Sequence, residues 1–254
     1  MVNDRAARVW ETVMRHAEQD GATPSLRHVC AACAEALSAA GVGFALTSSV
    51  GMFEPVSGTD PKVDELEELQ ATVGEGPGCE ALVSGEPVLV DDLASPGSVT
   101  RWPVFAPAAV DRGVRGMFSF PAGRGAVHVG VLEVFRDVTG PLSPRDLGDA
   151  FAYTDLAMLL VLDSRGGIAA SPAESTVRTG DGEAVLHSAE VHQAAGMLSV
   201  QLGIPVVDAL LRLRARAFAQ NVRLTELARS VVAREISFGP NGGSVSDSDL
   251  EGSA

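Results

Sequence analysis

The sequence predicts an α+β domain, an antiparallel sheet flanked by helices, followed by an all-α domain of three helices. Helices precede and follow the expected strands of the first part, an order typical of one antiparallel sheet with helices packed on it. Residues 166–182 are rich in Gly, Ser, Pro and Thr and contain almost no large apolar residue, which predicts a linker. The expected parts are an α+β domain 1–165, a linker 166–182, a helical domain 183–238 and a disordered tail 239–254.

The distribution of charge supports the same division. Residues 1–184 carry 13 Arg or Lys and 26 Asp or Glu, whereas residues 185–238 carry six Arg and four acidic residues. The formal net charge of −14 therefore hides a change of sign between the two parts. Such an asymmetry suggests that the parts have different tasks.

The elements of the first part follow from hydrophobic periodicity and turn residues. Val9, Val13 and Ala17 form an apolar stripe at helical spacing, and Ser143-Pro144 has the N-cap and first-turn residues of a helix start. Trp102–Ala109 is expected to be irregular or helical. The expected helices are Ala6–Gln19, Leu26–Ala40, Lys62–Gln70 and Ser143–Asp163, and the expected strands are Val42–Ser49, Met52–Val56, Val88–Asp91, Gly116–Pro121 and Val127–Phe135.

The second part reads as three helices with short connections. The first is expected over Glu183–Leu202 and stops at Gly203, and the second is expected over Pro205–Gln220 with proline in its first turn. The third is expected over Leu224–Ser237. The polar residues after it, rich in Ser, Asp and Gly, predict disorder.

Composition excludes several function classes. Of the 254 residues, 46% are hydrophobic, so a core can form, and the net charge of −14 argues against unspecific adhesion to nucleic acid or anionic membranes. The single lysine, Lys62, lies in an acidic helix and fits neither a P-loop nor a kinase site. Met1–Asp20 lacks the apolar run of a signal peptide, and three cysteines suit a reducing compartment, so we expect a cytoplasmic protein.

Two short motifs have both a functional and a structural interpretation. Cys30 and Cys33 have the spacing of a metal or redox pair, but they lie within a helix and no second pair exists, which favours packing cysteines. The run Gly74–Cys79 favours a tight turn over a phosphate loop, because Pro77 removes a backbone donor. Cys79 either lines a pocket or fills space. Neither these motifs nor the five histidines predict a metal, a cofactor or an enzyme.

The second helix of the C-terminal part carries arginines on one face. Arg212 and Arg216 are one turn apart, and Arg214 and Arg223 lie on the same helix or just beyond it. Arginine is suited to contact phosphate and to stack on exposed bases. The alternative is a solvated arginine face without a ligand. Leu211, Ala215 and Phe218 of this helix offer a second packing surface.

The C-terminal part resembles the ANTAR domain, a three-helix output module. The residues that carry the resemblance are Ala194–Leu198, Gly203-Ile204, Ala209, Leu213-Arg214, Ala217-Phe218, Asn221, Leu224 and Leu227-Ala228. Many members of that family bind RNA hairpins and so prevent a transcription terminator from forming. Ala195 departs from the family pattern, which often has Lys or Thr there, so one contact to RNA is in question.

The first part resembles a GAF domain, in the form that precedes ANTAR modules in actinobacteria. The resemblance rests on an ordered series of short segments: Val73–Pro77, Gly85–Asp91, Trp102–Ala106, Gly113–Gly116, Gly130–Val134 and Pro141–Pro144. GAF domains are sensory modules that bind small ligands or pair two chains. A ligand pocket is expected to include Phe44, Cys79, Phe118 and Phe120.

Together the two resemblances imply a non-enzymatic, signal-responsive regulator that acts by transcription antitermination. Two chains are expected to pair through Ala6–Gln19 and Pro144–Asp163, so that two helical domains grip RNA hairpin loops. The RNA-binding residues are expected to be Gln193, Gly196, Arg212, Arg214, Arg216, Asn221 and Arg223. Gly196 permits either a close approach of RNA or tight helix packing. The alternatives are a protein-interaction module and a DNA-binding regulator that uses the third helix.

Overall fold

The computed structural model describes residues 2–47, 53–124, 127–166, 182–220, 222–238 and 244–245. The chain divides into two compact units, Met1–Ala184 and Val185–Ala254, which we call unit 1 and unit 2. The expected linker 166–182 lies almost wholly outside the described residues. Each unit is therefore considered by itself.

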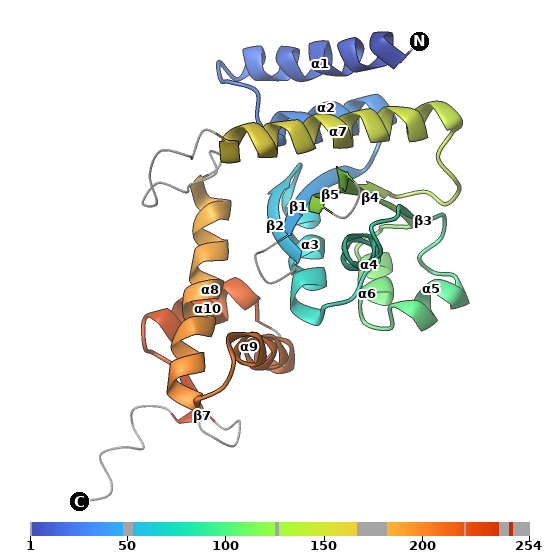
Figure 1. Cartoon of the computed structure of the whole chain (residues 1–254). Coiled ribbons are helices and arrows are strands. Elements are labelled where there is room, and N and C mark those ends of the chain that lie inside the picture. The colour runs from blue at the N-terminus through green and yellow to red at the C-terminus, as the bar shows by residue number, and fades with distance from the viewer. Residues whose placement is uncertain are drawn as a thin grey trace, which may run out of the picture. The chain divides into compact units, whose positions relative to one another are not determined.

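Unit 1 is built on a five-stranded antiparallel sheet with the strand order β2-β1-β5-β4-β3 (Figure 1). Its helices are α1 (Val2–Gln19), α2 (Leu26–Leu37), α3 (Pro61–Val73), α4 (Pro77–Ser84), α5 (Pro96–Arg101), α6 (Phe105–Asp111) and α7 (Pro144–Gly166). Its strands are β1 (Gly41–Thr47), β2 (Phe53–Gly58), β3 (Val88–Val90), β4 (Gly116–Arg124) and β5 (Val127–Arg136). The predicted antiparallel α+β architecture is confirmed.

Local residue chemistry places most of these elements where the sequence predicts them. Asp60 accepts hydrogen bonds from the backbone N–H groups of Lys62 and Val63 and so caps α3. Ser143 accepts the N–H of Asp146 at 3.1 Å, as a helix start requires. Two helices were missed. The predicted turn Gly74–Cys79 ends at Gly76, and Pro77 opens α4; Ser95 and Pro96 begin α5 in a segment for which no element was predicted.

The two faces of the sheet are covered by different helices (Figure 1). Helices α2 and α7 lie side by side on one face, with α1 packed along their outer side, and the apolar residues between these elements form one core. Helices α3, α4 and α6 cover the other face, where a second core lies. We call these the α2/α7 face and the α3/α4 face.

Cys30 and Cys33 are fully buried in the core of the α2/α7 face. Burial raises the pKa of the Cys30 thiol, and it raises the pKa of the Cys33 thiol as well. Both residues therefore pack as small apolar side chains, which confirms their prediction as packing cysteines.

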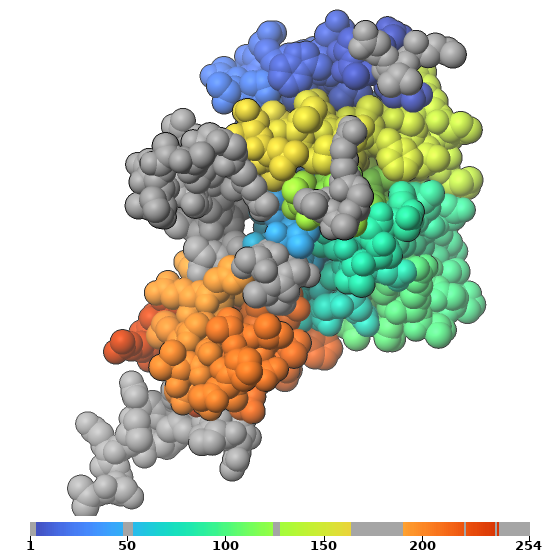
Figure 2. Space-filling model, viewed as in Figure 1, coloured from blue at the N-terminus to red at the C-terminus, as the bar shows by residue number. Residues whose placement is uncertain are grey.

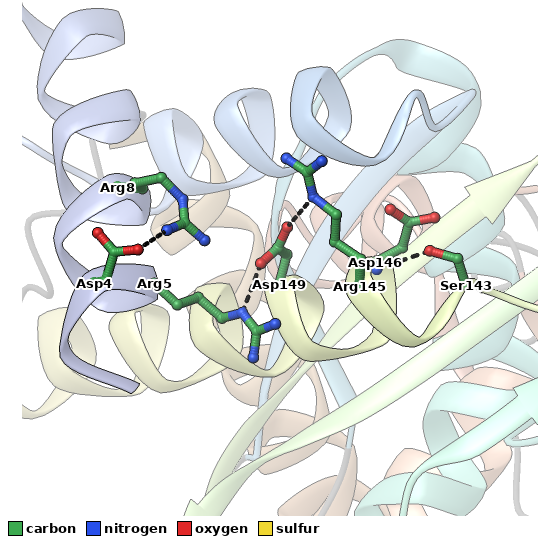
Figure 3. Close-up of polar contacts among 7 residues, drawn as sticks. All are labelled: Asp4, Arg5, Arg8, Ser143, Arg145, Asp146 and Asp149. Carbon is green, nitrogen blue, oxygen red and sulfur yellow. Dashed lines mark hydrogen bonds and ion pairs between the residues drawn. The ribbon is translucent and has the colours of Figure 1, made fainter. Parts of the chain in front are cut away.

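Helices α1 and α7 lie against each other (Figure 2), and an ion pair joins them at one end. The Arg5 Nε atom lies 2.8 Å from Asp149 Oδ1, and Asp149 also faces Arg145 one turn earlier on α7 (Figure 3). Val9, Val13 and other apolar residues of α1 complete the contact. The first helix is thus part of unit 1 and not a free extension.

Unit 2 consists of α8 (Gly182–Leu202), α9 (Val206–Gln220), α10 (Leu224–Val232) and the short strands β6 (Ser237–Phe238) and β7 (Ser244–Val245). Its buried residues include Ala194, Leu198, Leu213 and Ala217. Gly203, with a φ of +64°, ends α8 as predicted. Two differences are found. The third helix ends at Val232, and β7 pairs with β6 within the stretch predicted to be disordered.

No single helix of the described residues has the length and apolar character needed to cross a membrane. Only when Glu190–Leu202 and Val206–Gln220 are taken together, with a bend of 109° between them, do they meet that criterion.

Candidate functional site

The α3/α4 face carries a row of small and polar residues across four neighbouring strands. Gly43 of β1 lies opposite Gly58 of β2 on one side and opposite Glu133 of β5 on the other. Glu133 in turn lies opposite Ser119 of β4. Residues that are directly opposite one another in antiparallel strands point to the same face, so the four positions line up under α3 and α4.

Glu133 is a fully buried carboxyl group that accepts hydrogen bonds from two side chains. Gln70 Nε2 lies 3.1 Å and 2.9 Å from its two oxygens, and Ser119 Oγ donates to Oε1 at 3.1 Å. These donors favour the ionised form, yet burial outweighs them and raises the pKa of Glu133 to about 7. Glu133 can therefore gain or lose a proton near neutral pH.

Glu67 of α3 is a second fully buried carboxyl group beside the first. A Cβ atom on Gly43 would lie only 1.8 Å from Glu67 Oε1, so the carboxyl group occupies the space above that glycine. Because Gly43 lies opposite Glu133, and opposite Cβ positions are about 5 Å apart, the two carboxyl groups are close neighbours. We call Glu67 and Glu133 the carboxyl pair.

The surroundings of Glu67 contain no compensation for a negative charge. Neither carboxyl oxygen has a hydrogen-bond partner among the described residues. Burial raises the pKa of Glu67 most, and the acidic groups of Glu133 and Asp64 raise it further. Glu67 is therefore the member of the pair that keeps its proton, and Glu133, with its hydrogen-bond donors, is the member that ionises first.

Gln70 joins the carboxyl pair to the turn between α3 and α4. Its Nε2 donates to Glu133, and its Oε1 accepts the backbone N–H of Gly78 at 2.9 Å. Gly78 allows this approach, because a Cβ there would lie 2.1 Å from Glu133 Oε1. The start of α4 is thus tied through one amide side chain to the charge on β5.

The same turn is tied to α6 by Glu75. Its Oε1 accepts the backbone N–H groups of Val104 and Phe105 at 2.6 Å and 2.9 Å. These donors belong to the first turn of α6, where N–H groups lack helical partners and a carboxylate is favoured. The glycine-rich segment is therefore a junction between three helices, which accords with the predicted turn rather than a phosphate loop.

Chemically, the carboxyl pair is suited to hold protons or to receive hydrogen-bond donors. Two carboxylates at this distance cannot both ionise cheaply in a buried site. Within the described ranges, no group of three or more His, Cys, Asp and Glu side chains is arranged to hold a metal ion.

The residues predicted to form a ligand pocket are separated by the sheet. Phe44, Phe118 and Phe120 belong to the core of the α2/α7 face. The centre of the Phe120 ring lies 5.2 Å from the centre of the Phe151 ring. Cys79 packs against the core of the opposite face, and its Sγ lies 3.5 Å from the Gln70 carbonyl oxygen. Alternation of side chains along β1 and β4 is the reason, since each phenylalanine occupies the strand position that faces α2 and α7.

Sequence reasoning missed Glu67, Gln70, Ser119 and Glu133 as site residues. Glu67 and Gln70 stand in a helix whose many acidic residues favour a solvated face. One signal was readable, since Glu133 interrupts the otherwise apolar run Gly130–Phe135 at a position that the strand period sends into a core.

The predicted RNA-binding arginines lie on and beside α9. Arg212 is exposed, Arg214 is half-buried, and Arg216 is half-buried with its guanidinium 4.5 Å from the centre of the Phe238 ring. Arg223 is exposed and directly precedes α10. The structure thus places Arg212 and Arg216 on neighbouring turns of one helix, as the sequence predicts.

The remaining predicted contacts lie on α8 or outside the described residues. Gln193 is exposed on α8, and Asn221 lies outside the described residues. No heavy atom of the described chain lies within 4 Å of a Cβ placed on Gly196, so packing does not require this glycine. Ala195 is fully buried, so its side chain faces the core.

No protein-family model matches the chain, and no curated protein matches it significantly. Similar solved structures include the GAF domain of a phosphoenolpyruvate-protein phosphotransferase from Coxiella burnetii, which is 16% identical with a TM-score of 0.47 over 64% of this chain and 97% of that chain. The corresponding Acinetobacter domain is 12% identical with a TM-score of 0.47 over 66% and 96%. The second GAF domain of DevS from Mycobacterium smegmatis is 16% identical with a TM-score of 0.42 over 56% and 94%. Similarity at this level does not decide the family of the chain.

Proposed function

We propose that the chain is a non-enzymatic, signal-responsive regulator with a GAF-like sensor in unit 1 and an ANTAR-like output in unit 2. Unit 1 receives a small ligand or pairs two chains, and unit 2 binds RNA hairpins and so causes transcription antitermination. The ordered sequence motifs of both families support this proposal. Several of these motifs coincide with structural junctions: Gly85–Asp91 leads into β3, and Pro141–Pro144 leads into α7.

The observation that carries the RNA proposal is the arginine pair on α9. Arg212 is exposed, and Arg216 lies one turn away with its guanidinium above Phe238. A guanidinium that rests on an aromatic ring is positioned at low entropic cost for bidentate contact with phosphate. RNA loops present both phosphates and unstacked bases, which such a helix face can contact.

Gly196 supports the approach of a partner to α8. Because no described atom would contact a side chain at this position, the glycine leaves backbone accessible on a helix where alanine would be more stable. This favours the close-approach interpretation over tight helix packing. Replacement of Gly196 by leucine is expected to weaken RNA binding without loss of helical content, as measured by circular dichroism.

The test is a titration of the full chain against a leader RNA with two hairpins, a scrambled RNA and a duplex DNA at several salt concentrations. Binding through arginine should weaken as salt rises, and Arg212→Ala with Arg216→Ala should reduce both the affinity and the salt dependence. Arg145→Ala is the matched control, because it removes one charge from unit 1, where the Arg145 side chain is 81% exposed. Equal affinity for structured and scrambled RNA would refute the proposal.

We propose that two chains pair through α1 and α7. Trp10 on α1 and Phe151, Leu159 and Leu162 on α7 are exposed large apolar residues. Pairing would bring two output units onto two hairpins, and the linker would set their effective concentration. Light scattering at micromolar concentration should give the mass of a dimer, and Leu159→Asp should give a monomer. A monomeric wild-type chain, with and without RNA, would contradict the pairing.

A protein-interaction module is the second candidate for unit 2, and the apolar residues of α9 favour it. Val207, Leu211, Phe218 and Val222 are exposed on or just after this helix at spacings of four or seven residues. Leu211→Ser separates the two functions, because it should abolish docking of a protein while RNA binding persists. The DNA alternative has less support, since Arg229 of α10 is bound to Glu190 at 2.8 Å.

A further inference from the structure

Two acidic side chains of helix α3 fill the space above glycine residues of the sheet. Glu67 lies over Gly43, and Asp64, one turn earlier, would meet a Cβ on Gly58 at 2.1 Å. Gly43 and Gly58 are opposite residues of β1 and β2. The two glycines therefore admit α3 so closely that the Glu67 carboxyl group reaches the strand beneath it.

A negative charge on Glu67 is not stabilised in this arrangement. Its carboxyl group has zero solvent exposure, and within the described part of the chain neither oxygen meets a hydrogen-bond donor. A lone buried carboxylate costs several kcal/mol or more, so the seated position of α3 requires a neutral group. A proton on Glu67 provides that neutrality.

Among the described residues, the ionisable groups that interact electrostatically with Glu67 belong to α3, β5 and α2. Asp64 shares its helix, and Glu133 of β5 is its neighbour on the sheet. Cys30 of α2 feels the charge of Glu67 and is itself fully buried. Ser119 of β4 and Gln70 are neutral and are engaged with Glu133. The ionisable groups named here are all acidic, so each additional negative charge works against the closed arrangement.

We propose that the carboxyl pair is a proton-operated latch, which holds α3 and α4 on the sheet while it carries a proton and releases them when it loses its protons. The link to α4 is Gln70, which bridges Glu133 and the backbone of Gly78. The latch would give unit 1 a response to pH, or to a ligand that removes a proton from the carboxyl pair. This inference does not depend on the partner of unit 2.

The raised pKa values of both carboxyl groups agree with this geometry. Burial raises the pKa of Glu133 to about 7, and burial together with the negative charges of Glu133 and Asp64 raises the pKa of Glu67 well above its ordinary value. The closed state therefore holds protons that an open, solvated pair would release at the same pH. Opening should become about tenfold easier per pH unit for each proton released, up to the pKa of the closed state.

A direct test is the infrared spectrum of the full chain near pH 6.5, where ordinary carboxyl groups are ionised. Wild type should show the carbonyl band of a protonated carboxylic acid, and the band should fade as the pH rises. Glu67→Gln should weaken the band and leave only the part that Glu133 contributes, whereas Glu65→Gln, an exposed position on the same helix, should retain the full band. A wild-type spectrum without this band would overturn the proposal, and this outcome requires no variant to fold.

Hydrogen exchange tests the release itself. After correction for intrinsic exchange rates, amides of α3 and α4 in wild type should open about tenfold more often per pH unit for each of the two protons released between pH 5.5 and 7. The same amides in Glu67→Gln should respond less steeply, because one proton fewer is released, whereas Glu65→Gln should follow wild type. Identical pH dependence in all three proteins would also overturn the proposal. Neither measurement involves RNA, so its failure is separate from that of the proposed function.

Discussion

The two faces of the sheet are both covered by helices, but they present different kinds of side chain to those helices. On the α2/α7 face, alternate residues of β4 and β5 such as Phe118, Phe120, Leu132 and Val134 meet an apolar helix layer. On the α3/α4 face, the same strands present Ser119 and Glu133 among apolar neighbours. Both faces are equally closed to solvent at these positions, yet among the described residues only the α3/α4 face contains fully buried carboxyl groups.

Burial alone therefore does not identify a structural core. Apolar burial stabilises unit 1 at any pH, since its free energy follows the area removed from water. Burial of the carboxyl pair stabilises only the protonated form, so the stability of this face depends on pH. Under the proposed latch, the α3/α4 face responds to pH while the α2/α7 face keeps its packing.

The largest effect is expected for Phe120→Ala on the α2/α7 face. Phe120 is fully buried and contacts the Phe151 ring edge-on at 5.2 Å, so truncation should lower the free energy of unfolding by about 3–5 kcal/mol. Both tryptophans, Trp10 and Trp102, lie in unit 1, so urea unfolding followed by tryptophan fluorescence reports this unit alone. Val83→Ala, at a position 86% exposed, is the control and should change stability by less than about 0.5 kcal/mol. The distinction between the faces would weaken if the loss depended on pH.

A smaller effect is expected for Gly43→Ala on the α3/α4 face. The added methyl group would lie 1.8 Å from Glu67 Oε1, so α3 must shift, at a cost of about 1–3 kcal/mol. Glu67→Ala should relieve this clash, and the double variant should be less destabilised than the sum of the single variants. The same fluorescence-detected unfolding measures the coupling. Additive effects would show that Glu67 does not occupy the space above Gly43.

The pH dependence of the free energy of unfolding should also distinguish the two faces of the sheet. The folded-state pKa of Glu133 is about 7 against an ordinary value of 4.5, so its contribution is fully present below 4.5 and is lost as the pH rises through 7. The free energy of unfolding of unit 1 should therefore fall by about 1.4 kcal/mol per pH unit for each proton involved. Glu133→Gln should flatten this decline between pH 5 and 7, and Phe120→Ala should leave its slope unchanged. A wild-type slope equal to that of Glu133→Gln would contradict the raised pKa.

The sequence predicted the apolar face well and the polar face poorly. Val9, Val13, Cys30 and Cys33 were predicted as packing residues from helical spacing, and the structure buries all of them. Period and caps are local signals, which explains why most strands and helices of unit 1 fall within a few residues of their predicted bounds. The missed helix α4 follows from a local rule too, since Pro77 after Gly76 opens a helix as readily as it extends a turn.

The candidate site could not be predicted because it depends on strand register. Gly43, Ser119 and Glu133 come from three strands and meet only because Glu133 pairs with the other two. No spacing within one segment encodes that pairing. The predicted pocket failed to gather its residues for the same reason, since Phe44 and Cys79 were chosen without knowledge of the face on which each side chain lies.

The smallest effect is expected at the ion pair that joins α1 to α7 at the surface of unit 1. Arg5 Nε lies 2.8 Å from Asp149 Oδ1, but the Arg5 side chain is 38% exposed, so water and salt screen the attraction (Figure 3). Arg5→Ala should lower the free energy of unfolding by about 0.2–1 kcal/mol at low salt and by less in high salt. Arg145→Ala removes the longer contact of 3.7 Å to the same carboxylate and should have the weaker effect of the two. A loss above about 2 kcal/mol, or one that salt does not reduce, would show that α1 is held mainly by this pair and not by apolar packing. The stable face would then contain a charge-dependent element of its own, and the contrast with the carboxyl pair would be one of degree.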